Sequence, residues 1–260
     1  AGNGSPVRDA VILHAASPDD LPNENELKQE ITRVAANITA LTKAPEGDRY
    51  TGPVLFEAEA AAQFFADTFG RSLAVTRKPV MPPNAAIPFP SSELEGRIGS
   101  RVLPEWMDIV DDPRGREFRG KRLFGHYPID IEGVIPKPLK LVDKGVLKNV
   151  LLTRQPIAGQ QGTNGRARLP GPFGARRASF GNLFITASES SKPSELKQKL
   201  MELVKARGLS HGIIIRKMDF PSSASLKEVR KMIPSAQSGG GMQVLSQPVL
   251  VYRVFPDGRE

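Results

Sequence analysis

The sequence predicts an α+β fold, with a mostly antiparallel curved sheet or partly closed barrel and about three packed helices. Strand-like segments outnumber helical ones along the 260 residues, and some of them come as antiparallel hairpins. Three other segments carry apolar residues at helical spacing. Helices and antiparallel strands in one chain, with no internal repeat, are typical of this class.

Residues 1–22 are rich in Gly, Pro, Asn and Asp, and we expect a flexible lead ahead of a first helix between Asn23 and Pro45. Asn23 is a suitable N-cap, with Glu26 three residues on, and Pro45 stops the helix. We expect the helix to pack its apolar stripe against the domain, with a short coiled-coil seam as the alternative. The stripe repeats at alternating spacings of four and three residues and consists of Leu27, Ile31, Val34, Ile38 and Leu41.

A short strand is expected at 53–56 and a second helix at 57–69, where Gly70 suits the C-terminal cap. Repeated prolines in 77–95 favour an extended loop. The succession Ile213-Ile214-Ile215 is typical of a strand covered on both faces. The other predicted elements are strands at 106–110, 180–187, 212–218 and 247–255, charged or polar connections at 114–122 and 221–243, and a third helix at 194–207.

The segment 123–177 combines a hairpin with acidic and basic side chains. Leu139–Val142 and Val146–Thr153 are rich in Val and Leu, and Asp143-Lys144-Gly145 favours a tight turn between them. Upstream, Asp130 and Glu132 are expected in an extended segment, where side-chain alternation directs both carboxylates to one face. We predict that they face a cleft and pair with Arg154 or Arg166. Salt bridges that only hold the hairpin to its loop are the alternative.

Residues 162–168 are predicted to form a loop beside that face. Asn164 and Gly165 can adopt turn conformations that expose backbone N–H groups. Arg166 and Arg168 can project together toward carboxylates or carbonyls of a bound chain, and Gly133 allows close backbone approach. The alternative is a surface loop that serves solubility. The candidate polypeptide-binding residues are therefore Asp130, Glu132, Gly133, Asn164, Gly165, Arg166 and Arg168.

Composition excludes several kinds of site. The absence of cysteine rules out disulfides and thiolate metal ligands, and the three histidines stand apart, with no second ligand at helical spacing. The net charge of +8 is spread along the chain. The arginines between Arg154 and Arg177 lack the interleaved aromatics of single-strand readers, so nucleic acid is not an expected partner. No apolar run approaches the length of a membrane span, so no membrane partner is expected.

Several stretches resemble the C-terminal part of the TldD/PmbA family of zinc metallopeptidases and their partner subunits. They occur in the family's order and are Thr51-Gly-Pro-Val-Leu-Phe-Glu-Ala-Glu-Ala-Ala-Ala62, Arg97-Ile-Gly-Ser-Arg-Val-Leu-Pro104, Asp130-Ile-Glu-Gly-Val-Ile-Pro136, Asp143–Arg154 and Thr163–Arg168. The resemblance implies that 23–260 form the family's C-terminal domain, truncated at its C-terminus, and that 1–22 are a lead or the end of a missing N-terminal domain. It also implies a homodimer or a heterodimer with a relative, and a cytoplasmic location.

In that family the second helix carries a His-Glu-(three residues)-His zinc motif. The matching run here is Ala66-Asp67-Thr68-Phe69-Gly70-Arg71, so both ligand histidines are replaced and the general-base position holds Asp67. Ala66 offers no lone pair, and the guanidinium of Arg71 does not ligate metal. The resemblance is therefore to the PmbA-like members that lack the motif, and we expect no metal and no cofactor.

Three functions compete at this point. The preferred one is a PmbA-like subunit without zinc that binds or positions polypeptide in proteolysis, together with a partner subunit. The second is an active peptidase in which Asp67, Asp130 and Glu132 hold an activated or metal-bound water. The third is a basic module that binds nucleic acid or another polyanion through the arginines of 154–177. No cysteine is present to act as a nucleophile.

Overall fold

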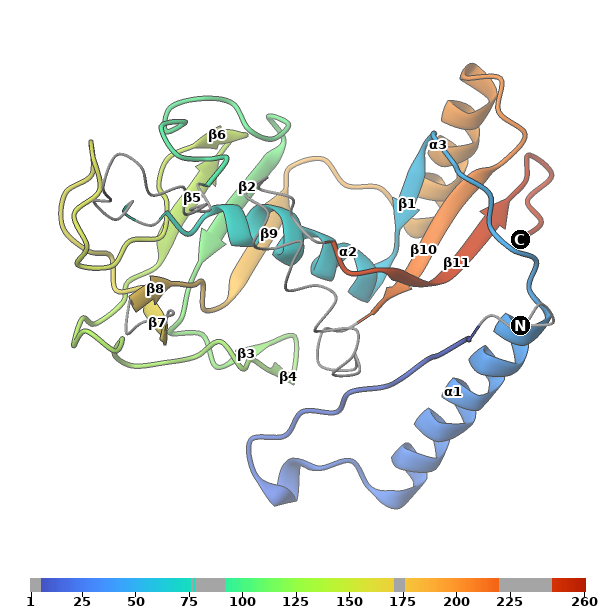
Figure 1. Ribbon diagram of the computed structural model, residues 1–260, viewed down its shortest axis with the longest axis horizontal. Coiled ribbons are helices and arrows are strands. Elements are labelled where there is room, and N and C mark those ends of the chain that lie inside the picture. The colour runs from blue at the N-terminus through green and yellow to red at the C-terminus, as the bar shows by residue number, and fades with distance from the viewer. Residues whose placement is uncertain (1–5, 76, 78–91, 171–175, 220–244) are drawn as a thin grey trace, which may run out of the picture. The chain divides into compact units, whose positions relative to one another are not determined.

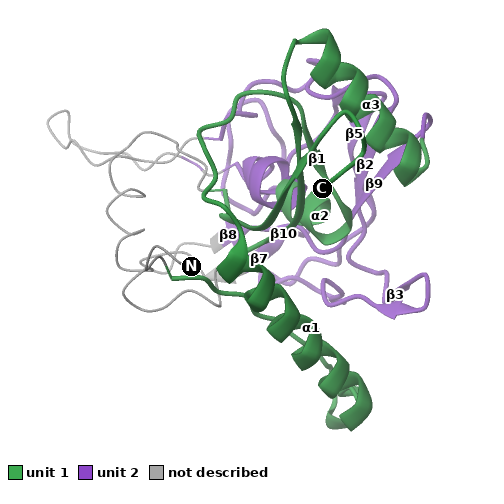
Figure 2. Ribbon diagram, turned by 90° about the vertical axis from the view of Figure 1, so that its right-hand side faces the viewer, with its two compact units in different colours: residues 1–64, 191–229, 245–260 green, residues 65–190, 230–244 purple. Residues whose placement is uncertain are grey.

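The structure is a computed structural model that describes residues 6–75, 77, 92–170, 176–219 and 245–260 (Figure 1). The chain divides into two compact units (Figure 2). Unit 1 comprises 1–64, 191–229 and 245–260, and unit 2 comprises 65–190 and 230–244. The α+β class is confirmed, and among the described strands all pairs but one are antiparallel. These strands form four separate sheets, none of them a closed barrel.

Unit 1 is built on a three-stranded sheet in the order β1 (Val54–Phe56), β10 (Gly212–Met218), β11 (Pro248–Val254). β1 runs parallel to β10, and β11 runs antiparallel to it. One face of β10 packs Ile213 and Ile215 against α2 (Ala58–Phe65), and the other packs Ile214 against α3 (Pro193–Ala206). The prediction that this strand is covered on both faces is confirmed.

The first helix, α1 (Glu24–Lys43), has the predicted N-terminus. Asn23 and Glu26 form a capping box, in which each side chain accepts a hydrogen bond from the other residue's backbone N–H. The expected packing of the apolar stripe is only partly present, because no α1 residue is buried and Ile31 is 66% exposed. One hydrogen bond, from Asn37 Nδ2 to Asp9 Oδ2 at 2.8 Å, joins the helix to the segment before it.

Unit 2 is built on a four-stranded antiparallel sheet in the order β6 (Val146–Leu147), β5 (Leu139–Asp143), β2 (Met107–Asp111), β9 (Leu183–Ala187). The predicted hairpin is confirmed: Lys144 and Gly145 form its two-residue turn with φ of 46° and 75°. Its second strand is shorter than predicted. The strand ends at Leu147, although Lys148 N still donates to the Leu141 carbonyl of β5 at 2.8 Å, and Leu151 forms a bridge to Ala74. The core contains the fully buried Leu73, Ile109, Leu141, Leu147 and Leu151.

Two short ribbons complete the described part of unit 2. One pairs β3 (Glu117–Phe118) with β4 (Lys121–Arg122), and the other pairs β7 (Ala167–Pro170) with β8 (Arg176–Ala178). The predictions for 77–95 and 221–243 fall mostly outside the described residues. Among the described residues, no helix combines the length and apolar character that crossing a bilayer requires.

Two local predictions are wrong. The segment around Asp130 is a turn, in which Gly133 has φ 78° and donates to the Asp130 carbonyl at 3.1 Å. It is not extended, because the Asp130 side chain captures nearby backbone N–H groups that a strand would present to a neighbour. Gly70 is not a helix cap, because the helical backbone continues past it through a π-helical turn, Ala66–Gly70, to Ser72. A Cβ at Gly70 would lie 2.7 Å from the Phe180 ring, so close packing explains the glycine.

Candidate functional site

A buried ion pair lies beneath the candidate loops of unit 2. Asp111, at the end of β2, is 0% exposed, and Arg166, just before β7, is 1% exposed. Arg166 Nε donates to Asp111 Oδ2 at 2.7 Å, and Gly181 N donates to Asp111 Oδ1 at 2.8 Å. Burial raises the pKa of the Asp111 carboxyl, and the charge and hydrogen bonds of Arg166 act against that rise. The prediction that Arg166 pairs with Asp130 or Glu132 is wrong, since its ion partner is Asp111.

The remaining donors of Arg166 hold three backbone segments together. Its Nη2 donates to the carbonyl oxygens of Lys137 at 2.7 Å and Asp111 at 3.1 Å, and its Nη1 donates to the Asn164 carbonyl oxygen. One guanidinium therefore fastens β2, the approach to β5 and the loop that contains Asn164. This is a structural role, because the side chain has no surface left for a ligand.

Asp130 shapes the neighbouring turn. Its Oδ1 accepts from the backbone N–H groups of Glu132 at 2.9 Å and Val134 at 2.8 Å, and its Oδ2 accepts from Ala167 at 3.1 Å. In return, Ile131 N donates to the Ala167 carbonyl at 3.0 Å. The carboxylate is 4% exposed. Asp130 thus ties its own turn to the start of β7 and does not face solvent.

Asn164 and Tyr127 fix the position of the loop 162–168 through hydrogen bonds. Asn164 accepts from Leu152 N at 2.9 Å and donates to the Val150 carbonyl at 2.8 Å. The Tyr127 hydroxyl donates to the Gly165 carbonyl at 2.8 Å, and burial raises the pKa of Tyr127 to about 12. Arg168 lies with its guanidinium 4.1 Å from the centroid of the Tyr127 ring, a cation–π contact that positions this cation.

Above this buried network the turn exposes three apolar side chains, which we call the isoleucine rim: Ile129 (49% exposed), Ile131 (49%) and Ile135 (72%). The space beside Gly133 is open, since a Cβ there would meet no atom within 4 Å. Glu132 accepts from the backbone N–H of Arg154 at 2.7 Å. Sequence reasoning missed the isoleucines. Their alternation with the acids indicated a strand, whose apolar face is normally buried.

The structure therefore brings most of the predicted residues into one neighbourhood, with different roles. The half-buried Asn164 and the buried Asp130, Gly165 and Arg166 form the support, which we call the buried support. Glu132, Gly133 and Arg168 lie at or near the surface above it. What the arrangement offers chemically is a rigidly supported apolar surface beside a positioned cation.

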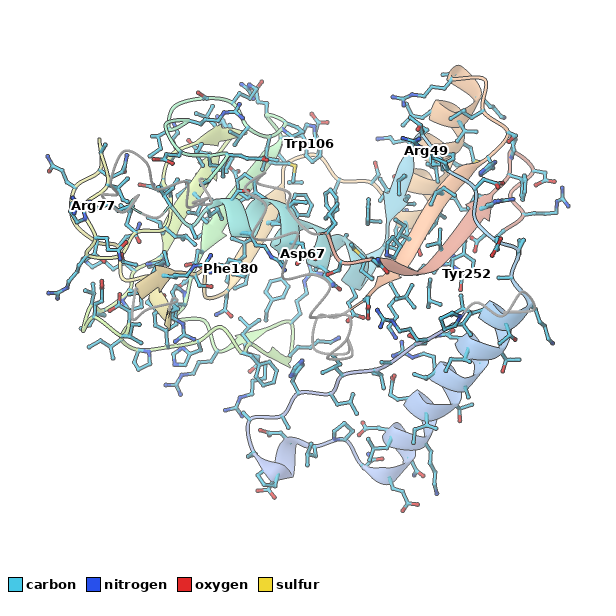
Figure 3. The ribbon with its side chains drawn as sticks, in the orientation of Figure 1. Arg49, Asp67, Arg77, Trp106, Phe180 and Tyr252 are labelled. Carbon is cyan, nitrogen blue, oxygen red and sulfur yellow. The ribbon has the colours of Figure 1, made fainter. Side chains whose placement is uncertain are left out.

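The turn that matches the zinc motif lacks the donors that a metal needs. Ala66 contributes only a methyl group, and Asp67 is 7% exposed, with its Oδ1 3.1 Å from Arg71 Nη2 (Asp67 and Phe180 are labelled in Figure 3). Nowhere among the described residues do three His, Cys, Asp or Glu side chains gather as a metal site would require. Asp67, Asp130 and Glu132 accordingly do not form a joint ligand set. The donor set does not fit a tetrahedral zinc ion.

Comparison with known proteins identifies a matching family and similar proteins. Residues 48–226 match the family model described as PmbA/TldA metallopeptidase C-terminal domain. A protein named metalloprotease from Archaeoglobus fulgidus is 29% identical over 151 residues, which cover 58% of this chain and 31% of that protein. The crystal structure of TldE from Thermococcus kodakarensis aligns with 16% identity and a TM-score of 0.47, covering 75% of this chain and 39% of that one. The chain thus spans less than half the length of either relative.

Proposed function

The chain belongs to the PmbA/TldA metallopeptidase C-terminal domain family, and we propose that it binds or positions an extended polypeptide at the isoleucine rim without a zinc ion of its own. The observation that carries the proposal is the exposure of three isoleucines on a turn that is fixed from beneath by buried charged groups. Exposed apolar side chains held in a defined geometry are typical of interaction sites.

The free energy available at the isoleucine rim suits a moderate affinity for polypeptides of different sequences. Covering the exposed part of each isoleucine would contribute on the order of 1–2 kcal/mol. The support adds preorganisation, because the turn is already ordered by hydrogen bonds from Glu132, Val134 and Ala167 to Asp130 and does not have to be ordered on binding. The open backbone at Gly133 leaves room for a second chain to approach.

Arg168 supplies a polar contact at the edge of the rim. It follows Ala167, whose carbonyl accepts from Ile131 N, so the cation is anchored beside the exposed isoleucines. The stacking of its guanidinium on Tyr127 holds it in place at little further entropic cost. We propose that it meets carbonyl or carboxylate oxygens of the bound polypeptide.

We further propose that peptide-bond cleavage is performed by a zinc-bearing relative with which this chain pairs. The replacement of both ligand positions by Ala66 and Arg71 supports this division of labour. The alternative of an active peptidase has less support, because the described carboxylates Asp67, Asp130 and Glu132 are not assembled into a metal-capable group.

The test uses binding of fluorescent, unstructured polypeptides, measured by anisotropy. Ile131→Ser/Ile135→Ser removes rim side chains that are 49% and 72% exposed, so the fold should persist. We expect affinity to fall at least about 10-fold, in line with a loss of roughly 2 kcal/mol. The matched control is Leu196→Ser/Leu203→Ser on α3, whose side chains are 39% and 51% exposed, and it should bind like wild type. Equal binding by both variants, with unchanged circular dichroism, would refute the assignment of this site.

A further inference from the structure

The β3–β4 ribbon of unit 2 concentrates the positive charge of the chain. Residues 114–122, Arg-Gly-Arg-Glu-Phe-Arg-Gly-Lys-Arg, hold five cations and one carboxylate, a net charge of +4 against +8 for all 260 residues. Every residue from 116 to 122 is exposed. The ribbon belongs neither to the core of unit 2 nor to the isoleucine rim, so neither packing nor the proposed peptide site explains its charge.

The ribbon has a defined shape. Glu117 pairs with Arg122 and Phe118 with Lys121, and Arg119 and Gly120 form the two-residue turn with φ of 51° and 74°. Because side chains alternate along a strand, Arg116, Phe118 and Lys121 lie on the same face. That face therefore presents an aromatic ring between two cations.

The aromatic ring is held in place and remains accessible. Phe118 is 48% exposed, and its ring packs on Phe184 of β9 with centroids 5.6 Å apart. The guanidinium of Arg119 lies 5.2 Å from the same ring. Within the described part of the chain, Arg114 is engaged by Asp112, whereas Arg116, Arg119 and Lys121 form no salt bridge with a carboxylate. Three cations of the ribbon are thus available to an anion.

We propose that the β3–β4 ribbon binds single-stranded nucleic acid, with phosphates held by Arg116, Arg119 and Lys121 and a base stacked on Phe118. Cationic side chains that alternate with an accessible aromatic ring are the combination that proteins use on single strands, because every base has a π-face and every linkage a phosphate. The predominance of arginine suits phosphate, which its planar fork contacts through two hydrogen bonds. The arginines of 154–177 have no aromatic residues placed between them, whereas in the β3–β4 ribbon Phe118 lies between cations.

The position of the ring disfavours an anionic membrane as the partner. Arg119 and Gly120 occupy the tip of the ribbon, and the phenyl ring lies behind them. Insertion of the ring into lipid would bury the tip cations first, which is costly. A duplex is also less suited, because its bases are stacked on one another and do not reach a phenyl ring.

The experiment measures binding of the whole 260-residue chain to a fluorescein-labelled oligo(dT) and an oligo(U) by anisotropy, at about 50 to 300 mM NaCl. Arg116→Gln/Arg119→Asn/Lys121→Gln removes three charges and keeps a residue tolerant of positive φ in the turn. We expect at least about 10-fold weaker binding at about 50 mM and a salt slope shallower by about 2, since each single-strand phosphate contact contributes about 0.7.

The matched control is Lys140→Gln/Lys144→Asn/Lys148→Gln, which removes two charges from the β5–β6 hairpin and one from the residue that follows it; Lys144 likewise has positive φ. It should weaken binding less than about 3-fold. Phe118→Leu, which keeps apolar packing on Phe184, should weaken binding about 5-fold or more without changing the salt slope, and Phe118→Trp should restore it.

Three results would overturn the proposal. Equal losses of oligonucleotide affinity in the ribbon and control variants would show that binding depends on the overall positive charge and that the ribbon is not a specific site. An unchanged affinity in Phe118→Leu would show that no base stacks on Phe118. Binding to phosphatidylserine vesicles or to duplex DNA in preference to both oligonucleotides would assign the ribbon to that other partner.

Discussion

Arg166→Ala is expected to destabilise unit 2 severely, because the side chain is part of the buried support and is only 1% exposed. The substitution leaves Asp111, 0% exposed, without its ion partner and removes donors from the carbonyl oxygens of Lys137 and Asn164. Breaking a buried pair by removing one partner costs about 3–5 kcal/mol. With a urea m-value of roughly 2–3 kcal/mol/M, the unfolding midpoint should fall by about 1.5 M.

The urea unfolding of unit 2 can be followed by the fluorescence of the single tryptophan. Trp106 directly precedes β2, the strand that ends at Asp111, so its fluorescence reports on unit 2 (Figure 3). Arg154→Ala is the matched control: that side chain is exposed, and the hydrogen bond to Glu132 comes from the backbone N–H, which alanine retains. It should unfold like wild type.

Two further measurements distinguish whether Arg166→Ala destabilises the protein by leaving Asp111 unpaired or only by creating a cavity. Without Arg166 the folded-state pKa of Asp111, already raised by burial, rises further. The native state then binds the extra proton more tightly than the unfolded state, so stability falls as pH rises and the deficit is smaller at pH 5 than at pH 8. Asp111→Leu/Arg166→Met should recover at least half of the lost stability. A loss below about 1 kcal/mol in Arg166→Ala, or a deficit independent of pH, would refute the reasoning.

The remaining predictions concern the same unit. Tyr127 donates to Gly165 only as a neutral phenol, and its pKa is raised from 10.0 to about 12. The native state therefore retains the proton longer, and stability should fall by about 2–3 kcal/mol between pH 10 and 12, a slope that Tyr127→Phe should reduce in alkaline urea titrations. Gly145→Ala should cost more than about 2 kcal/mol, because its Cβ would lie 2.3 Å from the Leu103 carbonyl oxygen. Gly159→Ala has the same φ of 75° but open surroundings, so it should cost only about 1 kcal/mol; equal unfolding midpoints would contradict the clash. Prolonged EDTA treatment should leave the thermal unfolding midpoint unchanged, and stoichiometric zinc by elemental analysis would contradict the expectation drawn from the donor set.

The elements that could be predicted from sequence are those whose causes are local. The capping box of Asn23 and Glu26 begins α1 whatever surrounds it. Gly145 permits the hairpin turn because positive φ is a property of one residue. The three successive isoleucines of β10 require cover on both faces, and any fold of this chain must supply it.

The candidate site depended on contacts between residues far apart in the chain. Arg166 finds Asp111 55 residues away, and no pattern in either segment indicates that pair. Asp130 lies in an alternating apolar–acidic sequence that is typical of a strand, yet its carboxylate binds Glu132, Val134 and Ala167 and closes a turn. The exposure of the isoleucine rim follows from that turn. Side-chain alternation predicts direction only if the backbone is extended, and here tertiary hydrogen bonds determined the backbone.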